Sequence, residues 1–129
     1  MAKEYTDELL LGFGEDGSQL VPVVTQDYKT KEVLILAFVN KEAFEETLRS
    51  GYATYYSRSR NELWKKGLTS GDLLKIEEIR INCEQNSLLY LVTPIGKGAC
   101  HAKKADGMPH TSCYYRKITL DNRLVFVEE

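Results

Sequence analysis

The three cysteines and two histidines of this sequence are the residues whose types could hold a metal ion. Cys100, His101, His110 and Cys113 fall within fourteen residues of polar, turn-rich sequence, and Cys83 lies upstream. Three thiolates and one water form an open tetrahedral zinc site, a pattern of catalytic zinc centres. The spacings, sixteen residues between the first two cysteines and twelve between the last two, are not those of a zinc finger. The three cysteines could therefore form a catalytic zinc site. Cys83 could instead be a small buried hydrophobic side chain, a common role of free cysteine.

His101, directly after Cys100, has three readings that the sequence leaves open. It could ligate the metal, or it could be a general base, because an imidazole with a reference pKa near ~6.5 transfers protons well at neutral pH. It could also be a loop histidine that bonds a backbone carbonyl.

A basic and aromatic segment, residues 57–71, has the composition of a phosphate-binding surface. It combines four cations with hydroxyl side chains, two glycines and the only tryptophan. Guanidinium groups and hydroxyls suit phosphate oxygens, and glycine lets a backbone N–H approach an anion. The tryptophan could stack on a base or fill the core, and the whole segment could be a solvated loop. The candidate substrate-binding residues are Arg58, Ser59, Arg60, Trp64, Lys66 and Ser70.

Apolar runs and turn residues predict an α+β domain with a mostly antiparallel sheet and one main helix. The helix begins after a possible N-cap at Asn40 and ends at Gly51, and it covers one face of the sheet. The run 33–39 is apolar at every position, which favours cover on both of its faces. A short helix is also expected over residues 1–10, and the 74–83 strand has a break near Glu77-Glu78. Strands are expected at 20–27, 33–39, 53–57, 74–83, 87–93, 114–118 and 123–127.

Length and composition limit the class of protein. The 129 residues fit a single domain, residues 1–129, and 43% hydrophobic with 28% charged residues is ordinary globular usage. A net charge of −2 argues against a nucleic-acid partner or an anionic-membrane surface. No apolar run approaches the ~20 residues that a membrane helix needs. The N-terminus is too polar for a signal peptide, so a cytoplasmic location with reduced thiols is expected.

Several blocks, in order, resemble the phosphoribosyl-AMP cyclohydrolase family of histidine biosynthesis. The similarity extends over residues ~19 to 118. The matching blocks are Gln26-Asp27, 30–34, Asn40 with Glu42-Ala43, 57–60, Leu63-Trp64, Lys66-Gly67, Ser70-Gly71, 99–101 and Ser112-Cys113.

The resemblance implies hydrolysis of the N1–C6 bond of the adenine ring in phosphoribosyl-AMP, a small-molecule nucleotide. It also implies an obligate homodimer with an interfacial metal site, in which three cysteines drawn from both subunits hold zinc. The zinc ligands here would be Cys83, Cys100 and Cys113, with His101 as general base. The substrate's two phosphates would explain the basic segment.

Two departures from the family pattern bear on cofactors. Family members carry three carboxylates around the first cysteine that bind magnesium, whereas this sequence has Asn82, Glu84 and Asn86. In an extended strand these three positions would share the face opposite Cys83. Because magnesium prefers anionic oxygens, we expect a zinc-only enzyme or a weak second cation site. Leu68 also replaces a usual glutamate, and the loop 102–111, with His110, is longer than usual; it could be a lid or a neutral extension.

Two other functions stay open at this stage. One is a divergent zinc aminohydrolase or deaminase that acts on another nucleotide, although the His-x-Glu and Pro-Cys-x-x-Cys signature of nucleobase deaminases is absent. The other is a non-catalytic binding domain clipped by zinc, in which His101 or His110 would close the fourth metal position. A substrate panel tests the first, and the zinc content of His101→Ala tests the second.

Overall fold

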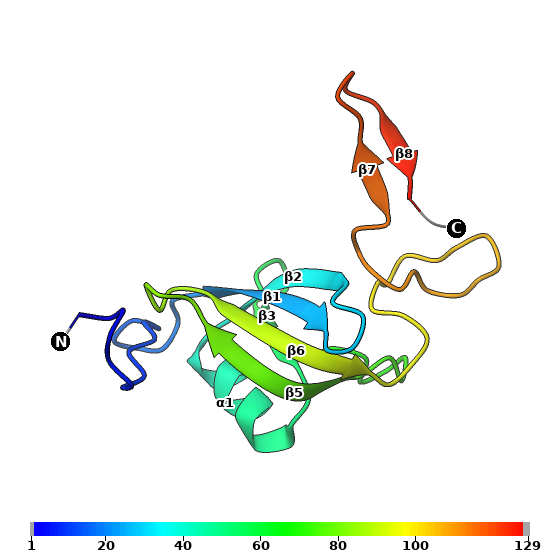
Figure 1. Cartoon of the computed structure of the whole chain (residues 1–129). Coiled ribbons are helices and arrows are strands. Elements are labelled where there is room, and N and C mark those ends of the chain that lie inside the picture. The colour runs from blue at the N-terminus through cyan, green and yellow to red at the C-terminus, as the bar shows by residue number, and fades with distance from the viewer. Residues whose placement is uncertain (1, 128–129) are drawn as a thin grey trace.

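The apolar runs of the sequence assemble into one four-stranded sheet and two small hairpins in the computed structural model, which describes residues 2–127 (Figure 1). The expected α+β class is confirmed. The elements are β1 (Val21–Asp27), β2 (Val33–Val39), α1 (Lys41–Ser50), β3 (Thr54–Ser57), β4 (Glu62–Lys65), β5 (Leu74–Ile81), β6 (Leu88–Pro94), β7 (Arg116–Ile118) and β8 (Leu124–Phe126).

The main sheet has the strand order β2-β1-β6-β5. β1 pairs antiparallel with β2 and β5 pairs antiparallel with β6, as expected for hairpins. The central β1–β6 pair is parallel, which hairpin connections alone do not predict. The register shifts between Ile76 and Glu78, so the predicted break near Glu77-Glu78 is confirmed as an irregularity in β5.

Helix α1 forms where the sequence places its start and stop signals. The Asn40 side chain accepts a hydrogen bond from the Ala43 N–H at 2.8 Å, which satisfies a free donor of the first turn. Gly51 ends the helix with φ of 79°, and its N–H donates to the Thr47 carbonyl at 2.9 Å. Glycine adopts this left-handed conformation without steric cost.

The core lies between α1 and one face of the sheet. Alternate residues of β1 and β6 are buried on this face, and the helix contributes Ala43, Phe44 and Thr47. The Tyr55 hydroxyl, fully buried, bonds the Thr25 hydroxyl at 2.7 Å, so its polar atom is satisfied inside the core. Burial raises the pKa of Tyr55 well above its usual range.

The opposite face of the sheet stays open in the single chain. Val24, Leu36 and Leu89 are register partners that share this face, and Leu36 is 49% exposed. The expectation that both faces of β2 are covered is therefore wrong for one chain, because α1 lies on the other side only (Figure 1). We call Val24, Leu36 and Leu89 the outer sheet face.

Two other expectations differ from the structure. Residues 2–10 form turns and extended chain, not a helix, because the Gln85 side chain binds the carbonyls of Lys3 and Glu8 and the Leu10 N–H, which a helix would use internally. A strand that was not expected, β4, pairs with β3 across a turn in which Asn61 has φ of 54°. Its sequence, Glu-Leu-Trp-Lys, is too short and polar to stand out.

The chain ends in a two-stranded hairpin, β7–β8, that stands away from the body (Figure 1). Its two strands were expected and are confirmed, although they are shorter than the runs 114–118 and 123–127. In the described part of the chain neither strand is hydrogen-bonded to another sheet, and all six of their residues are exposed. Within residues 2–127 no helix has the length and hydropathy needed to cross a membrane.

Candidate active site

The basic and aromatic segment folds into the β3–β4 hairpin and the turn that follows it, next to the Cys100–His101 dipeptide. Two hollows of about 350 and 630 Å³ flank this hairpin and share Arg60, Trp64 and His101 in their linings. Pockets of this size accommodate small organic ligands. The structure therefore brings together the two parts of the sequence that were singled out for phosphate binding and for metal chemistry.

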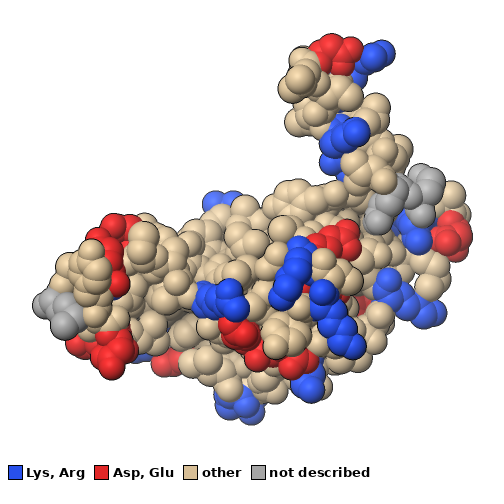
Figure 2. Space-filling model, viewed as in Figure 1, with Lys and Arg blue, Asp and Glu red and all other residues tan. Residues whose placement is uncertain are grey.

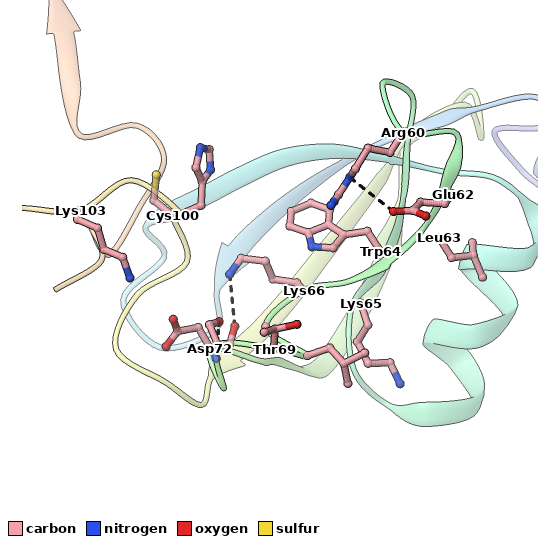
Figure 3. Close-up of a pocket in the computed structure, with 14 residues that line it drawn as sticks. Arg60, Glu62, Leu63, Trp64, Lys65, Lys66, Thr69, Asp72, Cys100 and Lys103 are labelled. Carbon is pink, nitrogen blue, oxygen red and sulfur yellow. Dashed lines mark hydrogen bonds and ion pairs between the residues drawn. The ribbon is translucent and has the colours of Figure 1, made fainter. Parts of the chain in front are cut away.

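Trp64 packs against the core and also lines both hollows. Its ring lies 5.7 Å from the ring of Tyr55, and it lines both hollows (Figure 3). Arg60 lies above it and pairs with Glu62 at 3.7 Å. Arg58 instead places its guanidinium 4.2 Å from the ring of Phe38, which lines the larger hollow. Of the other candidates, Lys66 and Ser70 line the smaller hollow and Ser59 the larger.

Lys66 is the buried cation of the site. Only 5% of it is exposed, and its Nζ donates to the Asp72 carbonyl at 3.5 Å (Figure 3). Burial lowers the pKa of Lys66, while Asp72, Cys113 and Cys100 act in the opposite direction. A buried ammonium with one weak partner is a ready site for an anion.

Asp72 is a site residue that the sequence reasoning missed. Its Oδ1 accepts from the Lys97 N–H at 2.8 Å, and this contact ties the β3–β4 side to the segment before Cys100. A Cβ at Gly96 would lie 2.0 Å from Asp72 Oδ1, and a Cβ at Gly67 would lie 2.1 Å from its carbonyl carbon. Gly67 and Gly96 lie close to Asp72 in space, where no side chain would fit. Their positions in the sequence do not indicate that they contact the same aspartate.

Cys100 and Cys113 form a thiol pair, of which Cys100 lines the smaller hollow. Cys100 is buried, and the Cys113 N–H donates to the Leu34 carbonyl at 2.8 Å, which fixes it to β2. The two thiols are close enough to interact electrostatically. Burial, followed by the neighbouring Cys100, raises the pKa of Cys113 to about 12, whereas Lys66 acts to lower it. A bound cation would stabilise both thiolates, because metal ligation deprotonates thiols.

The long loop between these cysteines folds back on itself as an irregular hairpin. The Cys100 N–H donates to the His110 carbonyl at 3.1 Å, and the His110 N–H donates to Ala102. His110 is 3% exposed and its ring stacks 3.5 Å from that of Tyr115, so the side chain does not reach the hollows. His101 is exposed and lines both hollows. The loop thus presents one histidine to the site and buries the other.

Cys83 lies at the opposite end of the sheet. It sits in the turn between β5 and β6 and is exposed, whereas Cys100 follows the far end of β6. The seven residues of β6 span about 20 Å at ~3.3 Å per residue. Within residues 2–127 of one chain, no three His, Cys, Asp or Glu side chains come together as a metal site. One chain therefore holds two of the three predicted ligands together.

The turn around Cys83 also corrects an expectation. β5 ends at Ile81, so residues 82, 84 and 86 do not share one face of an extended strand. The Asn82 Oδ1 accepts from the N–H groups of Asn86 and Ser87, both at 2.9 Å, and its Nδ2 donates to Asn86 Oδ1 at 2.6 Å. The two amides are bonded to each other and to the turn, which leaves Glu84 as the one carboxylate of this set.

Gln85 holds this turn to the N-terminal segment. It is 6% exposed and has φ of 54°. Its Oε1 accepts from the Leu10 N–H at 2.7 Å, and its Nε2 donates to the carbonyls of Glu8 and Lys3 at 3.2 and 3.3 Å. One side chain thus connects residues 3–10 with the turn that carries Cys83.

Replacing Gln85 with alanine should release the N-terminal segment and lower the free energy of unfolding by about 1–3 kcal/mol, because three part-buried hydrogen bonds worth roughly 0.5–1.5 kcal/mol each are lost. Proteolysis within residues 3–10 should become faster. The measurement is chemical denaturation together with limited proteolysis. Gln26→Ala, which removes a similar side-chain bond to the exposed Lys31 carbonyl, is the matched control and should change both by less. Equal effects in the two variants would contradict this role.

The chain is similar to known proteins over most of its length. The family model of phosphoribosyl-AMP cyclohydrolase matches residues 35–115. A phosphoribosyl-AMP cyclohydrolase of Desulfatibacillum aliphaticivorans is 47% identical over 118 residues, which is 92% of this chain and 89% of that protein. One from Archaeoglobus fulgidus is 50% identical over 111 residues, which is 86% of this chain and 94% of the relative. The histidine biosynthesis bifunctional protein HisIE of Aquifex aeolicus is 46% identical over 110 residues, half of its length.

These matches define a class of hydrolases, and the chain belongs to the phosphoribosyl-AMP cyclohydrolase family. The resemblance inferred from the sequence blocks is thereby confirmed. The matched range contains β3–β4, Lys66, all three cysteines and His101, whereas it ends just before the β7–β8 hairpin.

Proposed function

We propose that this protein hydrolyses the N1–C6 bond of the adenine ring in phosphoribosyl-AMP and so opens the ring. The observation that supports this most is the joint lining of one hollow by Trp64, Lys66, Cys100 and His101. These residues supply an aromatic surface, a buried cation, a metal-ligating thiol and a proton-transfer group. Phosphoribosyl-AMP, the substrate in the family's name, has a base for the aromatic ring, phosphates for the cation and a ring bond for the metal and the proton-transfer group to act on.

The donor set fits zinc. Cys100 and Cys113 are adjacent thiols in a buried setting, and soft thiolates are preferred zinc ligands. We infer that a second copy of the chain supplies Cys83, which is exposed on its own turn and too distant within one chain. Zinc bound by three thiolates would keep one position for water and lower the pKa of that water. The assembly proposed is a homodimer with two such sites.

The chain's own residues would orient the nucleotide and move the proton. Lys66 and Arg60 offer cations to the phosphates, and Trp64 offers its ring to the base. In the reaction the oxygen of a water bonds to C6, the C6–N1 bond breaks, and N1 receives a proton. We infer that His101, which lines both hollows, takes the proton from the water and delivers it to N1.

The test is hydrolysis of phosphoribosyl-AMP by zinc-loaded protein, followed by the ultraviolet change on ring opening. Turnover that a chelator abolishes, and that added zinc restores, would support the proposal. Absence of turnover in folded, zinc-replete protein would overturn it. Conversion of another nucleotide in a substrate panel would then favour a divergent aminohydrolase.

Magnesium should be dispensable. The Asn82 and Asn86 amides bond each other, and Glu84 alone provides an anionic oxygen, whereas magnesium binds through carboxylates and water. We expect turnover without added magnesium to stay within about twofold of turnover at millimolar magnesium, a difference below ~0.5 kcal/mol in barrier height. Steady-state rates with and without magnesium, in metal-stripped buffer with zinc restored, measure this. A strict requirement for magnesium would contradict it.

A further inference from the structure

Among the described residues, the β7–β8 hairpin pairs with no other strand, and one of its faces is largely apolar. In its antiparallel register Arg116 pairs with Phe126, Lys117 with Val125 and Ile118 with Leu124. Paired residues point to the same side, so Ile118, Leu124 and Phe126 share one face with Arg116 at its edge. These three side chains are between 57% and 73% exposed. Figure 2 shows the hairpin projecting from the body, with charged side chains at its tip.

Such a hairpin needs a covering surface. Two strands alone are marginally stable in water, and large exposed apolar patches indicate interaction sites. The aromatic stack of His110, Tyr115 and Phe126 fixes the base of the hairpin to the body, with ring distances of 3.5 and 6.0 Å. The hairpin is thus held in place but uncovered.

A matching surface lies on the outer sheet face. Beside the Cys83 turn, Val24 and Leu89 of this face line a hollow of about 390 Å³. Arg80, the register partner of Leu89, shares this face and lines the hollow too, and Ile81 lines it from the end of β5. On this face Val24 is 37% and Leu36 49% exposed, although the apolar run 33–39 predicts cover on both faces of β2. Within residues 2–127 of a single chain, the hairpin is not paired with the strands of this face.

The incomplete metal site indicates what covers both surfaces. The hairpin begins three residues after Cys113, and the hollow adjoins the turn that carries Cys83. If the Cys83 of one copy reaches Cys100 and Cys113 of another, the hairpin base of the second copy arrives beside the hollow of the first. The same contact repeats in the opposite direction, as two-fold symmetry requires.

We propose that the β7–β8 hairpin of each copy packs its Ile118, Leu124 and Phe126 face onto the outer sheet face of a second copy, beside that copy's Cys83 turn. This rests on the proposed function, since the second copy is the one that supplies Cys83. The hairpin then acts as a reciprocal arm that buries the two apolar surfaces left open in the single chain.

The experiment measures the dimer dissociation constant of zinc-loaded full-length protein by analytical ultracentrifugation. Leu124→Glu on the arm and Val24→Lys on the sheet should each weaken the dimer by on the order of 100-fold or more, because the symmetric interface contains each substitution twice. The double variant should recover at least tenfold, since opposite charges then meet between copies. Leu48→Glu on α1, 57% exposed like Leu124, is the matched control and should leave the dimer unchanged.

Circular dichroism separates these effects from unfolding, because Leu124 and Val24 are exposed in the single chain. A dissociation constant unchanged by Leu124→Glu or by Val24→Lys would overturn the arm. A wild-type protein that stays monomeric would overturn it as well. The two proposals can fail separately. If Leu124→Glu leaves both the dimer and its turnover unchanged, only the proposed arm is wrong. If the dimer depends on the arm but the protein shows no turnover, only the proposed reaction is wrong.

Discussion

Replacing His101 with alanine is expected to lower kcat for phosphoribosyl-AMP by about 10²–10⁴-fold, the usual contribution of a positioned general base. Zinc content should stay unchanged. His101 is exposed and lines both hollows, so its loss removes a proton-transfer group without opening the core. Steady-state kinetics and metal analysis of the same preparation measure the two effects separately.

Lys104→Ala, on the same loop but outside the lining of either hollow, is the control and should retain kcat within about twofold, as is usual for substitutions away from the chemistry. Loss of zinc from His101→Ala would instead identify a fourth ligand, and with it a closed structural site. Retention of full turnover would remove His101 from the mechanism.

Replacing Cys83 with serine should have the second large effect, although this residue lies far from the hollows in its own chain. We expect zinc affinity to fall by at least about 100-fold. The binding free energy of zinc in thiolate sites is roughly 10–16 kcal/mol, and the loss of one ligand removes a share of it. Turnover should be lost with the zinc, and the dimer should be weakened. Cys83 is exposed, so the fold of the single chain should not suffer.

Competition with a chromophoric chelator gives the zinc affinity, and sedimentation with and without chelator gives the dimer. Chelation of the wild-type protein should weaken the dimer in the same way, because a ligand shared between subunits links the two equilibria. Ser87→Ala, near Cys83 in sequence, is the control. If Cys83→Ser binds zinc as tightly as the wild type, the bridging arrangement is wrong.

The sequence predicted best the features that depend on local chemistry. Helix α1 runs between Asn40 and Gly51 because a capping amide and a left-handed glycine act within one turn of chain. The β1–β2 hairpin and the break in β5 follow from short-range pattern in the same way. The blocks around Trp64 and Cys100 identified the family for a different reason, namely residue identity in a fixed order.

Features that depend on distant partners were missed. The N-terminal segment loses its expected helix because Gln85, more than seventy residues away, binds its backbone. β4 forms because Trp64 packs on Tyr55, not because its four residues favour a strand. Likewise, the alternation around Cys83 breaks because Asn82 bonds the N–H groups of Asn86 and Ser87. Periodicity along the chain carries no information about any of these contacts.

The separation of Cys83 from Cys100 along β6 has a genetic consequence if the site is shared between subunits. A chain defective at Cys83 still offers an intact Cys100–Cys113 pair, and a chain defective at Cys100 still offers Cys83. Two inactive alleles of these kinds should complement each other when expressed together. Random assembly makes half of the dimers mixed, and each mixed dimer has one complete site, so about a quarter of the wild-type sites return. Two alleles defective in the same half, Cys100 and Cys113, should never complement.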